Sequence, residues 1–307
     1  MQSSCIGSLM ELAEKDTRVL YLTADSGEGG LDFMFRRNFP ERSFNFGIAE
    51  ENMVAAAAGL ASSGKIPFVY TAAPFLVYRS YEFIRNDICL QNLPVKLIGT
   101  GSGISVSSLG PTHHTTEDIS VLRCLPGLKI LSPETPKQAY ECMKMAYKIN
   151  GPVYIRLAMN KEKEFFTDDY QLPYGETEIL KDGFQTAIFT TGSILQEVME
   201  AAECLEKGGV STAVINVPIL KPFNRDDVMK QAEKVKLICT VEEHNIVGGL
   251  GSMIADALAE TNLMVKTLRI GLNDSFSVGY GTLPQIRKEN GLDAETIVRR
   301  IIQTIHE

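Results

Sequence analysis

Short apolar runs alternate with segments of helical periodicity along most of the chain. Runs of this length that are apolar throughout are typical of buried strands, and apolar residues three and four positions apart are typical of helices. In the first half, the predicted strands are 19–23, 67–71, 95–99, 128–131 and 152–157, and the predicted helices are 5–14, 50–61, 75–91 and 136–148. Strands of this kind between helices indicate a parallel sheet that is covered on both faces.

Residues 158–183 interrupt the alternation with a charge run at 160–164 and a polar, turn-rich stretch at 167–175. Such a segment predicts a linker. The pattern then resumes with predicted strands at 186–191, 211–217, 237–241 and 265–270, and with helices at 194–207 and from near Gly249. We therefore predict an α/β protein of two domains, 1–160 and 184–307, joined by a linker at 161–183. Each domain is expected to be a mostly parallel sheet flanked by helices.

Composition and charge exclude several classes of protein. The 307 residues carry a net charge of −8, which argues against a general nucleic-acid-binding face and against a polybasic membrane anchor. The longest apolar stretch, 68–78, is much shorter than the roughly 20 residues that span a bilayer. No signal segment is visible, and the six cysteines are scattered without metal-site spacing. We therefore expect a cytoplasmic protein.

Ligands of open parallel sheets gather at the carboxyl ends of the strands. Four loops follow predicted strands or open helices there: 23–30, 47–50, 99–105 and 247–251. The glycines at 99, 101 and 103 do not have the spacing of a dinucleotide site, and no helix follows them, so a flexible loop is predicted. The run Gly248-Gly-Leu-Gly opens a helix, and either anion binding or a close helix–strand contact explains it.

Three motifs carry a resemblance to the transketolase family. Phe46-Gly-Ile-Ala-Glu-Glu-Asn-Met-Val, followed by an alanine-rich helix, resembles the family's pyrimidine-binding domain. Gly110-Pro-Thr-His-His, followed by Glu117-Asp-Ile-Ser-Val-Leu-Arg, resembles its second signature. Thr240-Val-Glu-Glu-His-Asn-Ile-Val-Gly-Gly-Leu-Gly is similar to the C-terminal domain of the family. The agreement in order and spacing runs from about residue 5 to residue 305.

The resemblance implies thiamine diphosphate as the cofactor, bound between two chains or domains. In the family, a separate domain marked by Gly-Asp-Gly and a later Asn holds the metal and the diphosphate. This sequence contains no Gly-Asp-Gly and is about half as long as a full-length enzyme. The resemblance therefore implies the C-terminal subunit of a split transketolase, whose diphosphate-binding partner holds Mg²⁺ or Ca²⁺. An α2β2 heterotetramer is the natural assembly.

By the same resemblance, the expected activity is transfer of a two-carbon ketol unit from a ketose-like donor to an aldehyde acceptor, within carbohydrate metabolism. Glu50 matches the cofactor-activating glutamate, which shares a proton with a pyrimidine nitrogen. The alternative for Glu50 is a favourable place in the first turn of a helix, and that alternative alone suits Glu51. Phe75, Tyr78 and Tyr81 match the aromatic pocket that stacks on the aminopyrimidine, although such a stripe is more often core.

The remaining site residues also follow from the resemblance. His113 matches the histidine that reaches the substrate carbonyl or hydroxyl groups, and His114 is expected to point elsewhere. Asp25 resembles an aspartate near the thiazolium ring, and capping of a turn explains it equally well. Arg156 lies at a strand end as in 1-deoxyxylulose-5-phosphate synthases. It would bind an acidic substrate group or form an ion pair within the interface.

Four positions depart from the family pattern and bear on the substrate. Leu109 stands where sugar-phosphate transketolases have an acidic residue, and Gly101 stands where the family often has histidine. Gln2 and Met159 align with arginines that bind the substrate phosphate. A phosphate clamp favours guanidinium donors, so we hypothesise that the donor or acceptor is not an ordinary pentose phosphate.

Three alternatives remain open. The chain could be a subunit resembling 1-deoxyxylulose-5-phosphate synthase, or the β subunit of a 2-oxo-acid dehydrogenase, which shares the two-domain layout. It could also be a non-catalytic homologue that binds or regulates a partner. The retention of Glu50, the aromatic stripe and His113 argues against the non-catalytic alternative.

Overall fold

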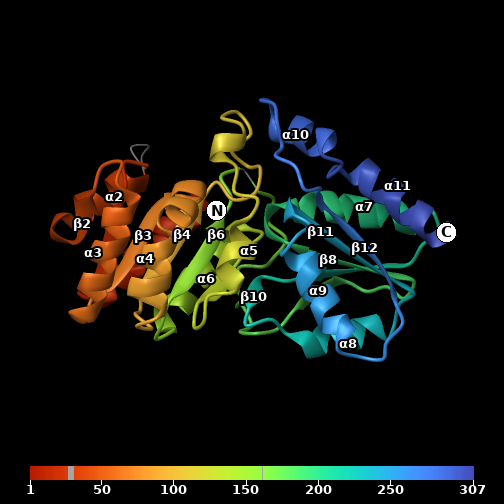
Figure 1. Cartoon of the computed structure of the whole chain (residues 1–307), viewed down its shortest axis with the longest axis horizontal. Helices are drawn as coiled ribbons and strands as arrows, with labels where there is room; N and C mark the ends of the chain where they lie inside the picture. The colour runs from red at the N-terminus through yellow and green to blue at the C-terminus, as the bar shows by residue number, and fades with distance from the viewer. Residues whose placement is uncertain (27–30, 161) are drawn as a thin grey trace.

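The computed structural model describes residues 1–26, 31–160 and 162–307, and it places them in two sheets that lie side by side (Figure 1). The first sheet has seven strands in the order β10-β5-β6-β4-β3-β1-β2. All neighbouring strands in it are parallel except β10, which pairs antiparallel with β5. The strands are β1 (Val19–Thr23), β2 (Ser43–Asn45), β3 (Ile66–Ala72), β4 (Lys96–Thr100), β5 (Lys129–Leu131), β6 (Val153–Leu157) and β10 (Ile219–Lys221).

Helices cover both faces of the first sheet, as the apolar strands predict. The helices around this sheet are α1 (Gln2–Lys15), α2 (Leu31–Asn38), α3 (Glu50–Ser62), α4 (Tyr81–Phe83), α5 (Asp118–Arg123) and α6 (Pro136–Lys148), with short 3₁₀ turns η1 (Pro40–Arg42) and η4 (Pro111–His113). On one face, α1 and α6 form a core with residues of β1, β3 and β6. On the other, α3 and the segment from 76 to 89 pack against the same strands.

The segment 75–91 is helical, as predicted, but most of it is wound as a π-helix. The π-helical turns η2 (Phe75–Arg79) and η3 (Ile84–Cys89) flank the single turn α4. Bonds from Leu90 N to Arg85 O and from Leu93 N to Ile88 O, both 3.0 Å, show the wider winding. Phe75 and Tyr78 lie in η2, and Tyr81 begins α4.

The second sheet has five strands in the order β12-β11-β8-β9-β7. These are β7 (Glu178–Lys181), β8 (Thr186–Thr191), β9 (Thr212–Asn216), β11 (Leu237–Asn245) and β12 (Lys266–Leu272). Its helical segments are η5 (Gly192–Ile194), α7 (Leu195–Lys207), α8 (Arg225–Ala232), α9 (Leu250–Ala259), α10 (Leu283–Glu289) and α11 (Ala294–His306). In Figure 1, α7 and α11 lie above this sheet, and α8 and α9 lie below it.

The predicted fold class is confirmed, because each sheet is mostly parallel and flanked by helices. Three strands were not predicted. β2 pairs parallel with β1 at the edge of the first sheet. β7 lies within the segment expected to be a linker and pairs antiparallel with β9. β10 follows β9 in sequence but adds to the edge of the first sheet beside β5. The division into domains at residues 160 and 184 remains a prediction, and Lys161 lies outside the described residues.

Within the described ranges, no helix is long and apolar enough to cross a membrane.

Candidate active site

The candidate site lies at the carboxyl ends of the strands in the first sheet. The loop after β4 and the turn η4 lie along the upper edge of this sheet in Figure 1. Helix α3 begins at the same edge with Glu50, which is only 1% exposed. The loop before it turns at Gly47, whose φ of +66° favours glycine. The Glu50 carboxyl group is thus held in the first turn of a helix, beneath the loops where ligands of such sheets bind.

Arg79 is the partner of Glu50. Its Nη1 lies 2.5 Å from Glu50 Oε2, and the carboxyl group is buried while 38% of the arginine side chain is exposed. The guanidinium carbon lies 4.9 Å from the centroid of the Phe75 ring. Arg79 was not among the residues predicted for the site. The signal was present, since an arginine four residues after Phe75 interrupts an apolar and aromatic segment.

Phe75 and His113 lie together. The Phe75 and His113 rings meet edge to face, with 5.2 Å between their centroids. His113 Nδ1 lies 3.0 Å from Thr112 Oγ1. The structure therefore brings Glu50, Arg79, Phe75 and His113 into one connected group.

The hydroxyl groups of Tyr78 and Tyr81 bond to Glu117 and to Val121 of α5. The Tyr78 hydroxyl donates to Glu117 Oε2 at 2.7 Å and accepts from the Glu117 N–H at 3.1 Å. The Tyr81 hydroxyl donates to Val121 O at 2.9 Å. Burial raises the pKa of Tyr78 far above its usual value, and burial together with the Cys124 thiol raises the pKa of Tyr81 to about 12. Both hydroxyl groups therefore stay protonated at neutral pH.

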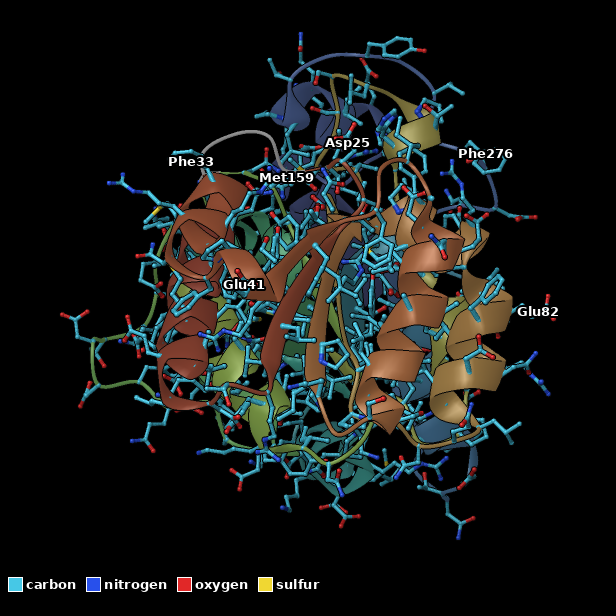
Figure 2. The ribbon with its side chains drawn as sticks, turned by 90° about the vertical axis from the view of Figure 1, so that its left-hand side faces the viewer. Asp25, Phe33, Glu41, Glu82, Met159 and Phe276 are labelled. Carbon is cyan, nitrogen blue, oxygen red and sulfur yellow. The ribbon has the colours of Figure 1, made fainter. Side chains whose placement is uncertain are left out.

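A pocket of about 480 Å³ opens beside Tyr78, between the two sheets. Its lining comes from the first domain, from the end of β11 and from the loop after β12, and comprises Tyr78, Glu117, Val121, Asn245, Asp274, Ser275 and Phe276. Phe276 is largely exposed, and Figure 2 labels it at the upper right of the molecule.

Asp25 follows β1 and forms part of a turn at the same edge. Its backbone is left-handed, with φ +53°, which is uncommon outside glycine and is tolerated best by Asp and Asn. Asn45 Oδ1 accepts from the N–H groups of Asp25 and Gly47, at 3.1 and 2.9 Å. Asp25 is thereby linked to the loop that leads to Glu50. The next four residues after Ser26, 27–30, lie outside the described residues.

His114, the next residue after His113, is buried. In the described parts of the chain, neither of its ring nitrogens has a hydrogen-bond partner. Burial lowers the pKa of His114, so its ring is neutral at pH 7.

Arg156 lies in a buried network between the two sheets. Its Nε donates to Asp118 Oδ2 at 2.9 Å, and its Nη2 donates to the carbonyl oxygens of Thr115 and Glu243, at 3.2 and 2.9 Å. Tyr154 also donates to Asp118, at 2.8 Å. Because Arg156 is only 2% exposed, these contacts favour the interface alternative over binding of a substrate.

The positions that depart from the family pattern surround the same edge. Leu109 and Met159 are about half exposed, and the Gln2 amide donates to the Tyr70 hydroxyl at 3.0 Å. Gly101 has φ +78°, and a Cβ there would lie 2.5 Å from Val106 Cγ2. The backbone at position 101 therefore accepts glycine and disfavours histidine.

The glycine run before α9 is explained by a close packing contact. The Glu242 carboxylate accepts from the N–H groups of Leu250 and Gly251, at 2.7 and 2.8 Å, inside the protein. This side chain satisfies the helix N-terminus that an external anion would otherwise bind. Of the two alternatives for this run, the contact within the protein is confirmed.

The residues at the edge suit one half of a thiamine diphosphate site. Glu50 offers a buried carboxyl group, and Phe75 offers an aromatic ring that contacts the same arginine, and these are the two kinds of contact an aminopyrimidine ring needs. Across the described ranges, no group of three or more His, Cys, Asp or Glu side chains could hold a metal ion.

Two family descriptions together match most of the chain. "Transketolase, pyrimidine binding domain" matches residues 5–161, and "Transketolase, C-terminal domain" matches residues 175–297.

Curated relatives agree with these matches. The chain is 36% identical over 277 residues to a subunit of the apulose-4-phosphate transketolase of Actinobacillus succinogenes, covering 90% of this chain and 89% of the relative. It is 34% identical to "Putative transketolase C-terminal section" of Methanocaldococcus jannaschii, covering 96% and 93%. It is also 34% identical to a 1-deoxy-D-xylulose-5-phosphate synthase of Caldanaerobacter subterraneus subsp. tengcongensis, covering 98% of this chain but 48% of that enzyme.

Solved structures have the same fold. A chain described as "Split gene transketolase, inactive beta4 tetramer" has a TM-score of 0.88 at 34% identity, and the match covers 99% of this chain and 97% of that one. The transketolase of Campylobacter jejuni subsp. jejuni has a TM-score of 0.78 at 21% identity, a likeness that shows the fold alone. This chain covers 46% of the length of that transketolase. The chain therefore belongs to the transketolase family, and consists of its pyrimidine-binding domain followed by its C-terminal domain.

Proposed function

We propose that this chain is one part of a thiamine-diphosphate-dependent, transketolase-like transferase that is active only with a diphosphate-binding partner. The observation that carries the proposal is the buried Glu50 carboxyl group at the carboxyl edge of the sheet, joined to Phe75 and His113 through Arg79. The reaction is transfer of a two-carbon ketol unit from a ketose-like donor to an aldehyde acceptor.

Thiamine diphosphate supplies the carbon nucleophile of this chemistry when it is bound. Glu50 holds a proton at the pyrimidine nitrogen, which is the task of a positioned general acid and base. Phe75 packs against the pyrimidine ring, and Tyr78, Tyr81 and Asp25 are the further proposed cofactor contacts. His113 binds the carbonyl or hydroxyl oxygens of the substrate, since an imidazole can donate or accept a proton near neutral pH.

A partner subunit completes the site in this proposal. It would bind the diphosphate and its Mg²⁺ or Ca²⁺, and two copies of each subunit would form an α2β2 assembly. Exposed apolar side chains on α2, β2 and the loop before Glu50 support an interface at this edge, since large exposed apolar patches mark interaction surfaces. They are Phe33, Met34, Phe44 and Ile48, the last 77% exposed. Figure 2 shows Phe33 beside the edge that holds Asp25.

The identity of the donor and acceptor is a separate proposal. Two relatives are named for apulose 4-phosphate and for 6-deoxy-6-sulfo-D-fructose, both anionic sugars. In this chain Met159 and Leu109 present apolar surface at the edge, and Gln2 is bonded to Tyr70. We therefore propose a donor or acceptor other than an ordinary pentose phosphate.

The test begins with a tagged form of this chain, purified with its partner and reconstituted with thiamine diphosphate and Mg²⁺. Glu50→Gln should reduce ketol transfer by at least about 10²–10⁴-fold, the usual contribution of a positioned general acid or base. Glu51→Gln, the neighbouring side chain, is the matched control and should keep nearly full activity.

Near-normal turnover by Glu50→Gln would refute the role of Glu50. Activity of this chain without a partner would refute the split site.

A panel of phosphorylated and unphosphorylated ketoses and aldehydes tests the substrate proposal, and efficient use of xylulose 5-phosphate with ribose 5-phosphate would contradict it. A lipoyl-dependent oxidative decarboxylation would instead favour the 2-oxo-acid dehydrogenase alternative.

A further inference from the structure

Arg79 is the one charged side chain that contacts Glu50 in the described ranges of the structure. It ends the π-helical turn η2, and such turns occur frequently at functional sites. In an α-helix, a residue four positions after Phe75 would lie on the same face, one turn further along. In the wider turn, Arg79 reaches across to α3, 29 residues earlier in the sequence.

We propose that Arg79 is a positioning residue for Glu50, and that it holds one carboxyl oxygen so that the other faces the cofactor's pyrimidine ring. This inference rests on the proposed function of the site. Nη1 of Arg79 lies 2.5 Å from Oε2 of Glu50, and Oε1 has no hydrogen bond or ion pair to another of the described residues. A glutamate side chain has three rotatable bonds, so a fixed contact at one oxygen determines where the other points.

The arginine is itself held in place. Its guanidinium group lies over the Phe75 ring, with 4.9 Å from Cζ to the ring centroid, which is within the range of a cation–π contact. The Phe75 ring in turn meets the His113 ring edge to face. Arg79 therefore ties the carboxyl group proposed for the cofactor to the aromatic ring and the histidine proposed for the cofactor and substrate.

A purely structural ion pair is the competing explanation. A buried carboxyl group needs a partner, and removing one partner of a buried pair destabilises a protein without any functional role. The two explanations differ in what they predict for the folded enzyme. A structural pair affects the unfolding temperature only, whereas a positioning pair also affects the affinity for the cofactor.

The experiment measures thiamine diphosphate affinity by calorimetric titration of the complex of this chain with its partner, freed of cofactor, with Mg²⁺ present. Arg79→Gln should weaken the affinity about tenfold or more, since a charge-assisted hydrogen bond is lost. Arg79→Lys keeps the positive charge but loses the planar guanidinium group, so its affinity should lie between those of Arg79→Gln and the wild type. The KM for both substrates should stay within about twofold, because Arg79 acts through Glu50. Arg225→Gln is the matched control, since it removes an arginine from the exposed pair with Glu260, and should leave the affinity unchanged.

Each outcome decides the question. Unchanged affinity in folded Arg79→Gln would overturn the positioning role, and a gain in affinity would mean that Arg79 competes with the cofactor, which also overturns it. If Arg79→Gln does not fold, Arg79→Lys decides, and wild-type affinity in that variant would leave only a structural pair. Glu50→Gln, measured in parallel, separates the two proposals. If Glu50→Gln retains full cofactor affinity and turnover, the proposed function fails. If Glu50→Gln loses affinity and turnover while Arg79→Gln retains both, only the positioning role of Arg79 fails.

Discussion

Lys96 is a cationic residue that the fold buries completely. It begins β4, and its Nζ donates to the carbonyl oxygens of Ile149 and Gly151, each at 2.7 Å, just after the end of α6. Burial lowers the pKa of Lys96 from 10.5 to about 7. A neutral amine retains two N–H donors, and two carbonyl oxygens are present to accept them. The folded protein therefore holds this side chain with little need for its charge.

The lowered pKa predicts how stability varies with pH. Between about pH 7 and 10, the unfolded chain binds a proton at Lys96 that the folded chain has released, so the free energy of unfolding rises with pH. The contribution of one such group is at most about 1.4 kcal/mol per pH unit, and we expect about 1. Lys96→Met should flatten the rise, as measured by urea unfolding at pH 7, 8 and 9.

Lys207→Met provides the control, because Lys207 lies exposed at the end of α7. Its pH dependence should match that of the wild-type chain. An identical slope in wild type and Lys96→Met would contradict the prediction.

At the scale of elements, the start of α9 depends on one buried carboxylate and one glycine. Glu242, on β11, accepts the first free N–H groups of the helix, and Gly249 precedes them at the N-cap. A Cβ on Gly249 would lie 2.1 Å from Glu242 Oε2 and 2.7 Å from His244 Nδ1. Both neighbours are buried, so neither can move aside without breaking this cap.

We therefore expect Gly249→Ala to lower the free energy of unfolding by about 2 kcal/mol or more, through overpacking and the loss of the cap. Gly7→Ala is the matched control. It lies inside α1, and no atom lies within 4 Å of its added Cβ, so it should raise the stability by about 0.5–1 kcal/mol. Chemical denaturation of both variants provides the measurement, and equal shifts would refute the steric argument.

At the scale of the whole molecule, a buried network joins the two sheets beneath the His113 turn. Arg156 on β6 binds Asp118 of the first domain and Glu243 O of the second, while Arg287 on α10 donates to Glu243 Oε1 at 2.6 Å. Arg156 also bonds to Thr115 O, two residues after His113. The second domain thereby helps to hold the loop of the candidate site.

Arg156→Met should lower the free energy of unfolding by about 3–5 kcal/mol, because Asp118 is left as a buried charge without its cation. Arg225→Met breaks the exposed pair with Glu260 and should change stability by less than about 1 kcal/mol. Thermal and urea unfolding compare the two. A small effect of Arg156→Met would contradict the importance of the network.

The fold class, most of the strands and the place of Glu50 follow from the amino-acid sequence alone. Largely apolar runs such as 19–23 and 153–157 lie in fully buried strands, and the helix that starts at Glu50 begins where predicted. These features are local, since a strand buried on both faces is largely apolar along its length. The motif around Glu50 is also contiguous, so the resemblance could locate it without coordinates.

Which side chains meet is visible only in the folded chain. Arg79 and Glu50 are 29 positions apart, and Arg156 and Glu243 are 87 apart, so no local pattern records either contact. The Tyr78 and Tyr81 hydroxyl groups bond to Glu117 Oε2 and Val121 O, 39 and 40 positions later in the sequence. β7 and β10 pair through short segments at the sheet edges, where few apolar positions mark a strand. Such contacts depend on how distant segments pack, and packing is a property of the tertiary structure.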